Sequence, residues 1–248
     1  MNPIDCTRAV QQPVNKLGSG FMVDGATFAR APEIGLEPGL GFYMIGRFGA
    51  LGRAHHDVIA ASAAFFAPAT VAALWDDAVR KADPARAATL FMDCADRWGR
   101  ANLAGVEGLD RLNGLAGKVV EAASPVAAAL FGGLRALPRS SDAAGLLTQL
   151  SFLLRELRMS RHVVAVLAEG LTPLESILSG GGGEANAKMF GWQPPFPDVA
   201  ALHDRRADAE KLTSKVHAAD FAVLTDDERD ELAAGYAAAF AAVSPAES

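Results

Sequence analysis

The sequence predicts an all-α protein of two helix-turn-helix-like halves, with little or no sheet. Half of the 248 residues are hydrophobic, and much of that fraction is alanine, the strongest helix former. Apolar residues recur at helical spacing, whereas alternating strand patterns are few. Prolines and capping residues mark helix starts. We expect an N-terminal half, residues 1–123, and a C-terminal half, residues 124–248, packed as one compact unit.

In the N-terminal half the predicted helices are separated by Gly and Pro. The first spans residues 5–17 and is expected to break at Pro13, which has no backbone N–H. Residues 18–50 are rich in Gly and Pro and predict mostly loop, with a short helix around Ala26. Further helices are expected over residues 52–66, 68–81, 85–103 and 105–122. Pro68 suits a first helical position, where its missing N–H costs nothing.

The C-terminal half opens with a predicted loop, residues 124–141, followed by the longest helix, residues 142–169. A short helix over residues 173–178 begins at the capping box Thr172-Pro173-Leu174-Glu175. After a Pro/aromatic loop at 191–197, helices are expected over residues 198–222 and 225–243.

A weak internal repeat agrees with the division into halves. Val58-Ile59-Ala60 with Phe66-Ala67-Pro68 matches Val163-Val164-Ala165 with Leu171-Thr172-Pro173 at the same spacing, and Arg53 falls opposite Arg158. One interpretation is a duplicated helix-turn-helix half. The other is that any helical hairpin opened by proline has this pattern.

Composition excludes several classes of protein. The net charge is −6 and no block of Lys or Arg occurs, which argues against a nucleic-acid partner. The two cysteines lack metal-ligand spacing. The longest uncharged run, Val58–Trp75, is too short for a membrane span, and no signal peptide is visible, so we expect a cytoplasmic protein. A homodimer is compatible with a helical chain, although no heptad seam is readable.

The helix at 142–169 carries the best candidate site. Ser151, Arg155, Arg158, His162 and Glu169 share one face of it, opposite Leu153, Leu157 and Val164, which are expected in the core. Two arginines beside a neutral histidine can bind a carboxylate or phosphate. His162 could move a proton, and Glu156 could orient an arginine, so these two are the catalytic candidates. The alternative is an ordinary solvated face with intrahelical ion pairs.

Arg47 is the second candidate, because a buried arginine in a glycine-rich segment must find an anion or carbonyls. The alternative is a surface arginine. Tyr43 and Trp192 complete the expected ligand-binding set, with Trp192 also readable as a loop anchor.

The histidines outside this set predict no metal site. His55 and His56 are adjacent, so on a helix they should point about 100° apart. His203 and His217 lie on a charged helix and are expected to be exposed. No motif names a cofactor.

Several segments together resemble a family of mostly uncharacterised actinobacterial proteins described as helix-turn-helix and related to winged helices. The matching segments, from about residue 14 to 240, are Gly41-Phe42-Tyr43 with Gly46-Arg47 and Leu51-Gly52, Phe65-Phe66-Ala67-Pro68, Leu154-Arg155-Glu156-Leu157-Arg158 with His162-Val163-Val164-Ala165, Gly170-Leu171 with Leu174-Glu175, and Gly191-Trp192.

The chain also departs from this family. Residues 14–18 contain no histidine, Leu157 stands where relatives often have His, and the segment after Trp192 is too short for a wing. A missing wing and an acidic total argue against winged-helix DNA binding. Arg47, Arg155, Glu156, Arg158 and His162 survive as the polar set, and the resemblance favours a functional role for them.

Three functions are therefore considered, in this order. The first is a small-molecule-binding protein whose pocket for a polar or anionic ligand is lined by Arg and His. The second is an enzyme that uses His162 as general acid or base while arginines hold an anionic substrate. The third is a DNA-binding regulator, which would need a basic recognition helix that neither candidate second helix supplies.

Overall fold

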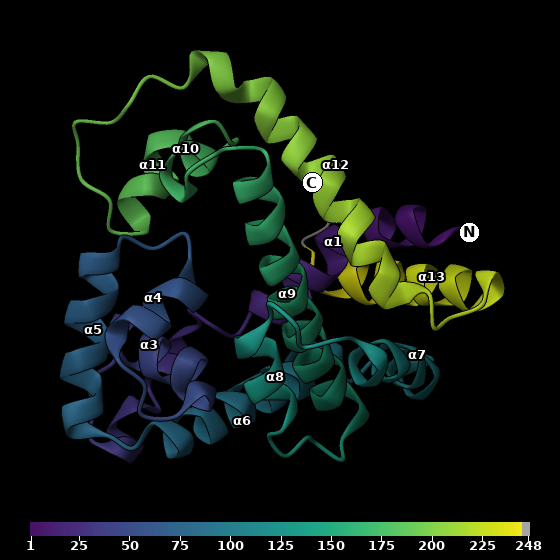
Figure 1. Ribbon diagram of the computed structural model, residues 1–248. Coiled ribbons are helices and arrows are strands. Elements are labelled where there is room, and N and C mark those ends of the chain that lie inside the picture. The colour runs from purple at the N-terminus through teal and green to yellow at the C-terminus, as the bar shows by residue number, and fades with distance from the viewer. Residues whose placement is uncertain (245–248) are drawn as a thin grey trace.

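The protein, seen in a computed structural model that describes residues 1–244, is built from helices alone (Figure 1). Within these residues there are thirteen α-helices, four short 3-10 helices and no strand, which confirms the all-α prediction. No helix in this range is long and apolar enough to cross a membrane. The α-helices are α1 (Pro3–Ser19), α2 (Gly25–Phe28), α3 (Leu40–Phe48), α4 (His56–Ala63), α5 (Pro68–Lys81), α6 (Pro84–Leu103), α7 (Leu109–Ala122), α8 (Ala129–Arg135), α9 (Ala143–Ala168), α10 (Pro173–Leu178), α11 (Gly183–Met189), α12 (His203–Ala218) and α13 (Asp226–Val243).

Helix α9 runs through the middle of the molecule and contacts α1, α6, α7, α8 and α12 (Figure 1). Its buried apolar residues lie all around the first four turns, which is the pattern of a helix enclosed by protein. The sequence predicts a polar face that includes Ser151 and a core face that includes Val164. This assignment is wrong for both residues, because Val164 is 42% exposed whereas Ser151 is fully buried. The main hydrophobic core extends from Cys6 to Ala239 and draws on both halves of the chain.

Glycines allow the closest helix crossings on α9. A Cβ at Gly18 in α1 would lie 2.6 Å from the carbonyl oxygen of Ser151, and one at Gly99 in α6 would lie 2.4 Å from that of Ala144. Both separations are shorter than van der Waals contact. The glycines therefore let two backbones approach α9 where any side chain would hold them apart.

Two helical hairpins opened by proline are present, α4–α5 and α9–α10, as the repeat predicts. The shift that maps Val58 onto Val163 also carries Pro3–Ser19 onto residues 108–124, the region of α7. The same shift carries Gly25–Phe28 onto residues 130–133, inside α8. The shift also carries Pro84–Leu103 of α6 onto residues 189–208, most of which lie in no α-helix. Both interpretations of the repeat therefore stay open, and the boundary at residues 123/124 stays a prediction.

Three local expectations are wrong. Helix α1 continues through Pro13, because its buried face packs on α9 and α13. Helices α3 and α8 occupy segments expected to be loop. One glycine in each is a packing position, since a Cβ at Gly46 would meet the ring of Phe91 and one at Gly133 would meet the backbone of Ala50. Helix α12 begins at His203 instead of near residue 198.

We expect Gly99→Ala to lower the free energy of unfolding by about 1–3 kcal/mol, because the added methyl group overpacks the α6–α9 crossing. Gly114→Ala is the matched control. Gly114 also lies inside a helix but has open space around its Cβ position, so alanine should stabilise the protein by about 0.5–1 kcal/mol. Urea unfolding followed by circular dichroism measures both changes. Equal effects of the two substitutions would contradict the close crossing.

Candidate functional site

Arg47 and Glu156 form a buried ion pair between α3 and α9. Arg47 Nε donates to Oε1 of Glu156 at 3.1 Å and Nη2 donates to Oε2 at 2.8 Å, a bidentate arrangement. The two side chains are only 4% and 1% exposed. Of the two alternatives for Arg47, a buried or a surface arginine, the structure shows the buried one. The anion that pairs with Arg47 is the carboxylate of Glu156.

Two neighbours complete this cluster. Arg47 Nη1 donates to the hydroxyl oxygen of Tyr43, one turn earlier on α3, at 2.6 Å. Arg155 Nη1 donates to Oε1 of Glu156 at 2.6 Å, and its Nε donates to Asn15 of α1 at 3.1 Å. Four of the seven predicted site residues thus lie together.

The cluster of Tyr43, Arg47, Arg155 and Glu156, called here the junction cluster, carries a net positive charge. Burial by itself would raise the pKa of Glu156, but the charges of Arg47 and Arg155 and their hydrogen bonds hold this pKa below its usual value. Glu156 is therefore an ionised acceptor. With two arginines to one carboxylate, the cluster has a charge of about +1.

His162 belongs to a different cluster, on the side of α9 that faces α12. Its Nδ1 lies 2.8 Å from Oγ1 of Thr213, which itself donates to the Ala209 carbonyl at 2.6 Å. The hydroxyl proton is thus committed, so Nδ1–H donates to Thr213. The imidazole also stacks on the ring of Phe65, with centroids 5.6 Å apart.

Burial lowers the pKa of His162 to about 4, and the charges of Arg206 and Arg158 act in the same direction. Glu210 opposes the shift, with Oε1 at 3.9 Å from Nε2 of His162. Arg158 reaches the same carboxylate at 2.7 Å, and so does Arg206 at 2.8 Å. Arg158 and His162 therefore share Glu210 rather than joining Arg47 and Arg155.

A third buried polar cluster was missed in the sequence. Arg161 donates Nε and Nη2 to the two oxygens of Asp220, at 3.1 and 2.9 Å, and Nδ1 of His217 lies 2.9 Å from the same carboxylate. His217 is 3% exposed, so the expectation of an exposed residue is wrong. The charged sequence around His217 suggests an exposed helix, because α12 turns only one narrow face toward α1 and α9.

Trp192 lies at a separate contact, where the loop after α11 meets the turn between α4 and α5. Trp192 Nε1 donates to the Phe65 carbonyl at 2.8 Å, and the Ala67 N–H donates to the Phe190 carbonyl at 2.9 Å. Gly191, at φ 86°, leaves room for Thr70, whose side chain would lie 2.1 Å from an added Cβ. Trp192 is thus an anchor in this structure, and residues 193–202, which include the 3-10 helix Ala200–Leu202, separate it from α12.

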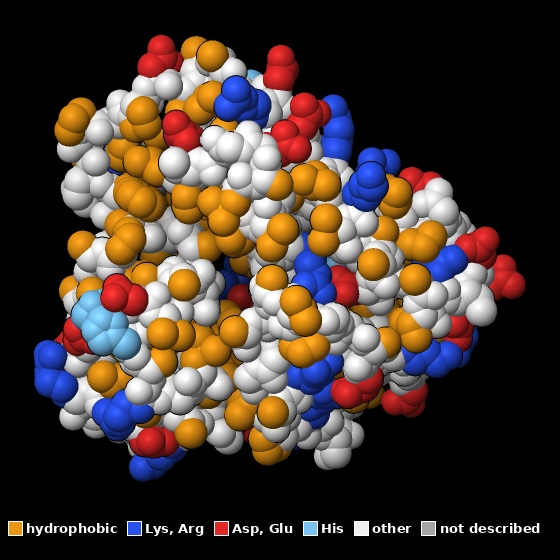
Figure 2. All heavy atoms as spheres, viewed as in Figure 1, with side chains coloured by type: hydrophobic (Ala, Val, Ile, Leu, Met, Phe, Trp, Pro, Cys, Tyr) orange, Lys and Arg blue, Asp and Glu red, His pale blue; other side chains and the backbone are white. Residues whose placement is uncertain are grey.

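A cleft of about 380 Å³ lies between α4, the start of α8 and α9. Figure 2 shows a hollow near the centre of this face, with basic and acidic side chains at its bottom. The walls are mostly apolar and include Ala61, Leu130, Val163 and Val164. Ser62, Ser160 and Glu156 add polar groups. The junction cluster therefore borders this cleft through Glu156, whereas His162 does not line it.

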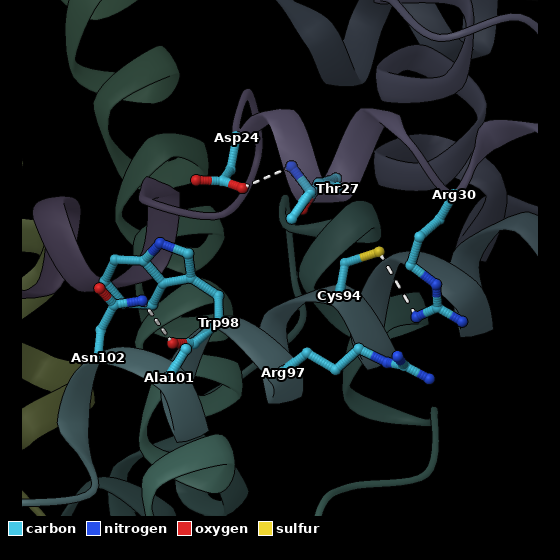
Figure 3. Close-up of a pocket in the computed structure, with 9 residues that line it drawn as sticks. Asp24, Thr27, Arg30, Cys94, Arg97, Trp98, Ala101 and Asn102 are labelled. Atoms are coloured by element: carbon cyan, nitrogen blue, oxygen red, sulfur yellow. Dashed lines mark hydrogen bonds between the residues drawn. The ribbon is translucent and has the colours of Figure 1, made fainter.

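A second cavity, of about 350 Å³, lies between α2 and α6, with Trp98 on one side and Asp24 on the other (Figure 3). Its arginines are committed to acidic neighbours. Arg30 donates to Glu33 and Asp93, and Arg97 donates to Asp93 at 3.0 Å. This cavity contains none of the predicted site residues, so the cleft beside α9 is the better candidate.

A family model described as a helix-turn-helix family matches residues 7–248. The chain belongs to this helix-turn-helix family. The match spans both hairpins and confirms the helix-turn-helix part of the resemblance. No curated protein and no solved structure matches the chain.

In this helix-turn-helix protein, Arg47→Ala should lower the free energy of unfolding by about 3–5 kcal/mol, because it leaves the charge of Glu156 buried without its main partner. The double variant Arg47→Met/Glu156→Leu should regain much of that loss, since an apolar pair of similar size replaces the two buried charges, while Arg155 keeps Asn15 and its 16% exposure to solvent. Chemical unfolding measures both.

Arg8→Ala is the control for this experiment. Arg8 pairs with Asp5 at 3.7 Å on the surface, and both side chains are more than half exposed, so its loss should change stability little. If Arg47→Ala were as mild as Arg8→Ala, the buried pair would not be the stabilising contact described above.

His162 should make the stability of the helix-turn-helix protein depend on pH. Its pKa is about 4 in the folded protein against 6.5 for the free side chain, so only the unfolded chain takes up the proton between these values. The stabilisation is complete above pH 6.5 and is lost as the pH falls toward 4. Unfolding of the wild type and His162→Gln at several pH values should give curves that converge over this window. Parallel curves would show that His162 does not titrate as described.

Proposed function

We propose that this helix-turn-helix protein binds a small molecule in the cleft between α4 and α9. The ligand class is a largely apolar compound with one anionic group. The observation that carries the proposal is the position of the junction cluster, which has a net charge of about +1 and borders an otherwise apolar cleft through Glu156.

The size and lining of the cleft support this proposal. Ligand sites are typically concave, mostly apolar and equipped with a few convergent polar groups, and they occur where two parts of a fold meet. The cleft has a volume of about 380 Å³, and α4 and α9 come from opposite halves of the chain. The hydroxyl group of Ser62 lies among apolar side chains and could donate to a ligand. That of Ser160 donates to the backbone carbonyl of Glu156 at 3.0 Å, so it could accept from a ligand.

The charge of the cluster favours an anionic head group. Arg47 and Arg155 together outweigh Glu156. Only Glu156 lines the cleft, whereas Arg155 lines a separate groove beside Asn15 of α1. In a cleft of low dielectric constant, a surplus positive charge attracts an anion more strongly than it would in water. The predicted ligand-binding residues Tyr43, Arg47 and Arg155 would then act mainly through the field of the cluster, with Glu156 as its fixed acceptor.

The enzyme hypothesis is less well supported. A general acid or base must reach the substrate and carry a pKa near the working pH. His162 is 6% exposed, its pKa is lowered to about 4, and its Nδ1 is bonded to Thr213. We therefore interpret His162 as a neutral packing residue between α9 and α12.

The family description makes DNA binding the second candidate function. A recognition helix needs a free N-terminal end in the major groove. In α5 this end contacts Phe190 and Gly191, and the helix carries two half-buried acids, Asp76 and Asp77. A gel shift with genomic fragments at low salt tests this function, and a shift at micromolar protein would favour it over ligand binding.

The ligand proposal predicts a thermal shift that depends on the anionic group. A series of alkanoates and arylalkanoates should raise the melting temperature, whereas their carboxamides should raise it less. Arg155→Gln should reduce the preference for the carboxylate, because it removes the surplus charge while Arg47 still neutralises Glu156.

Val164→Trp should abolish the thermal shift, because Val164 lines the cleft and is exposed enough to accept a larger side chain. Val223→Trp is the matched control, since Val223 is similarly exposed but lies outside the cleft lining. Binding that survives Val164→Trp would rule out this cleft as the site.

A further inference from the structure

His55 and His56 lie closer together than two neighbouring helical residues should. His55 is the N-cap of α4, with φ −62° and ψ 146°, and only His56 has helical geometry. This change of backbone conformation brings the two imidazole rings to a centroid distance of 4.0 Å. The splayed arrangement expected from the sequence is therefore wrong.

Asp57 lies beside both rings. Its Oδ2 is 3.3 Å from Nδ1 of His55, and its Oδ1 is 3.8 Å from Nε2 of His56. Each of the three residues offers one potential metal-ligand atom, and these three atoms all lie within 4.8 Å of one another. In a tetrahedral site with bonds of about 2.0–2.1 Å, donor atoms lie roughly 3.3 Å apart, so small side-chain movements suffice.

Asp76 of α5 orients His56 from the opposite side. Its Oδ2 lies 2.9 Å from Nδ1 of His56, so this nitrogen carries the proton and donates it to the carboxylate. Nε2 then keeps its lone pair and faces Asp57. A carboxylate that accepts from the second nitrogen of a metal-ligating histidine is a recurrent feature of metal sites.

We propose that His55, His56 and Asp57 bind a divalent transition-metal ion, with Asp76 as the residue that positions His56. Two imidazoles and one carboxylate favour Zn²⁺, Ni²⁺, Co²⁺ or Cu²⁺ over Mg²⁺ and Ca²⁺, which prefer oxygen ligands. Figure 2 shows histidine side chains at the surface with acidic groups beside them. Three protein ligands at an exposed position leave at least one coordination position for water or a further ligand.

One existing contact competes with the ion. Nδ1 of His55 accepts a hydrogen bond from the backbone N–H of Asp57 at 3.3 Å. This distance is longer than that of a strong hydrogen bond from a backbone N–H, so this helix-capping contact competes only weakly with the ion. His55 is also 64% exposed, which leaves its ring free to turn.

The test is a calorimetric titration of metal-free, untagged protein with Zn²⁺ and with Ni²⁺. We expect one ion per chain, and no binding of Mg²⁺ under the same conditions. His56→Ala should weaken binding at least about tenfold, because it removes one ligand, and Asp76→Asn should weaken it about 10–100-fold. His203→Ala, at another exposed helix start, should leave the affinity unchanged.

The double variant His55→Ala/His56→Ala decides the question. Both substitutions are on exposed or half-buried positions at a helix end, so circular dichroism should show an unchanged helix content. Unchanged metal affinity in this variant would overturn the proposal, and so would the absence of Zn²⁺ and Ni²⁺ binding by the wild type. The cleft beside α9 shares none of these side chains, so ligand binding there is tested independently.

Discussion

Glu156 sets the main constraint on this structure, because it places a buried charge in the middle of the central helix α9. An unpaired carboxylate at that depth would cost several kcal/mol, so α3 must bring Arg47 to it, and α1 must leave room for Arg155 beside Asn15. The bidentate geometry fixes α3 against α9 in both translation and rotation.

The same arrangement gives a structural reason for the segments that resemble the helix-turn-helix family. They lie far apart in the chain but contact one another in the structure. Tyr43 and Arg47 meet Glu156, while Phe65 and Ala67 meet Trp192 and Phe190. The first contact holds α3 against α9, the second holds the turn of the first hairpin against the loop after α11, and the cleft lies along the same boundary. These segments therefore have a structural role first, and any ligand in the cleft would use a boundary that the fold already needs.

Sequence patterns predicted the helices whose signals are local. Capping boxes at Thr172 and Thr225 and first-turn prolines at Pro68 and Pro173 mark helix starts that the structure has. Glycine was misleading, because Gly46 and Gly133 lie inside helices where another backbone or ring comes close. Whether a glycine breaks a helix or admits a neighbour depends on contacts between distant segments, and a single sequence does not contain them.

The candidate site was predicted only in part, because its contacts also join distant segments of the chain. Helical spacing placed Arg155, Arg158 and His162 on one face of α9, and this spacing is correct. It could not show that these arginines pair with different carboxylates. Arg155 pairs with Glu156, on the side of α9 that faces α3, and Arg158 pairs with Glu210 of α12. The exposure of His217 was misjudged because α12 has a charged sequence and only one narrow buried face.

The duplication that the internal repeat suggests would bear on the number of sites per chain. In the shift that maps Val58 onto Val163, Arg47 corresponds to Phe152 and Glu156 to Leu51. A dimer of identical subunits would place such an ion pair on both sides of its twofold axis. Here the corresponding second position holds two apolar side chains, so the chain has one charged boundary at this register where an assembly of equal copies would have two.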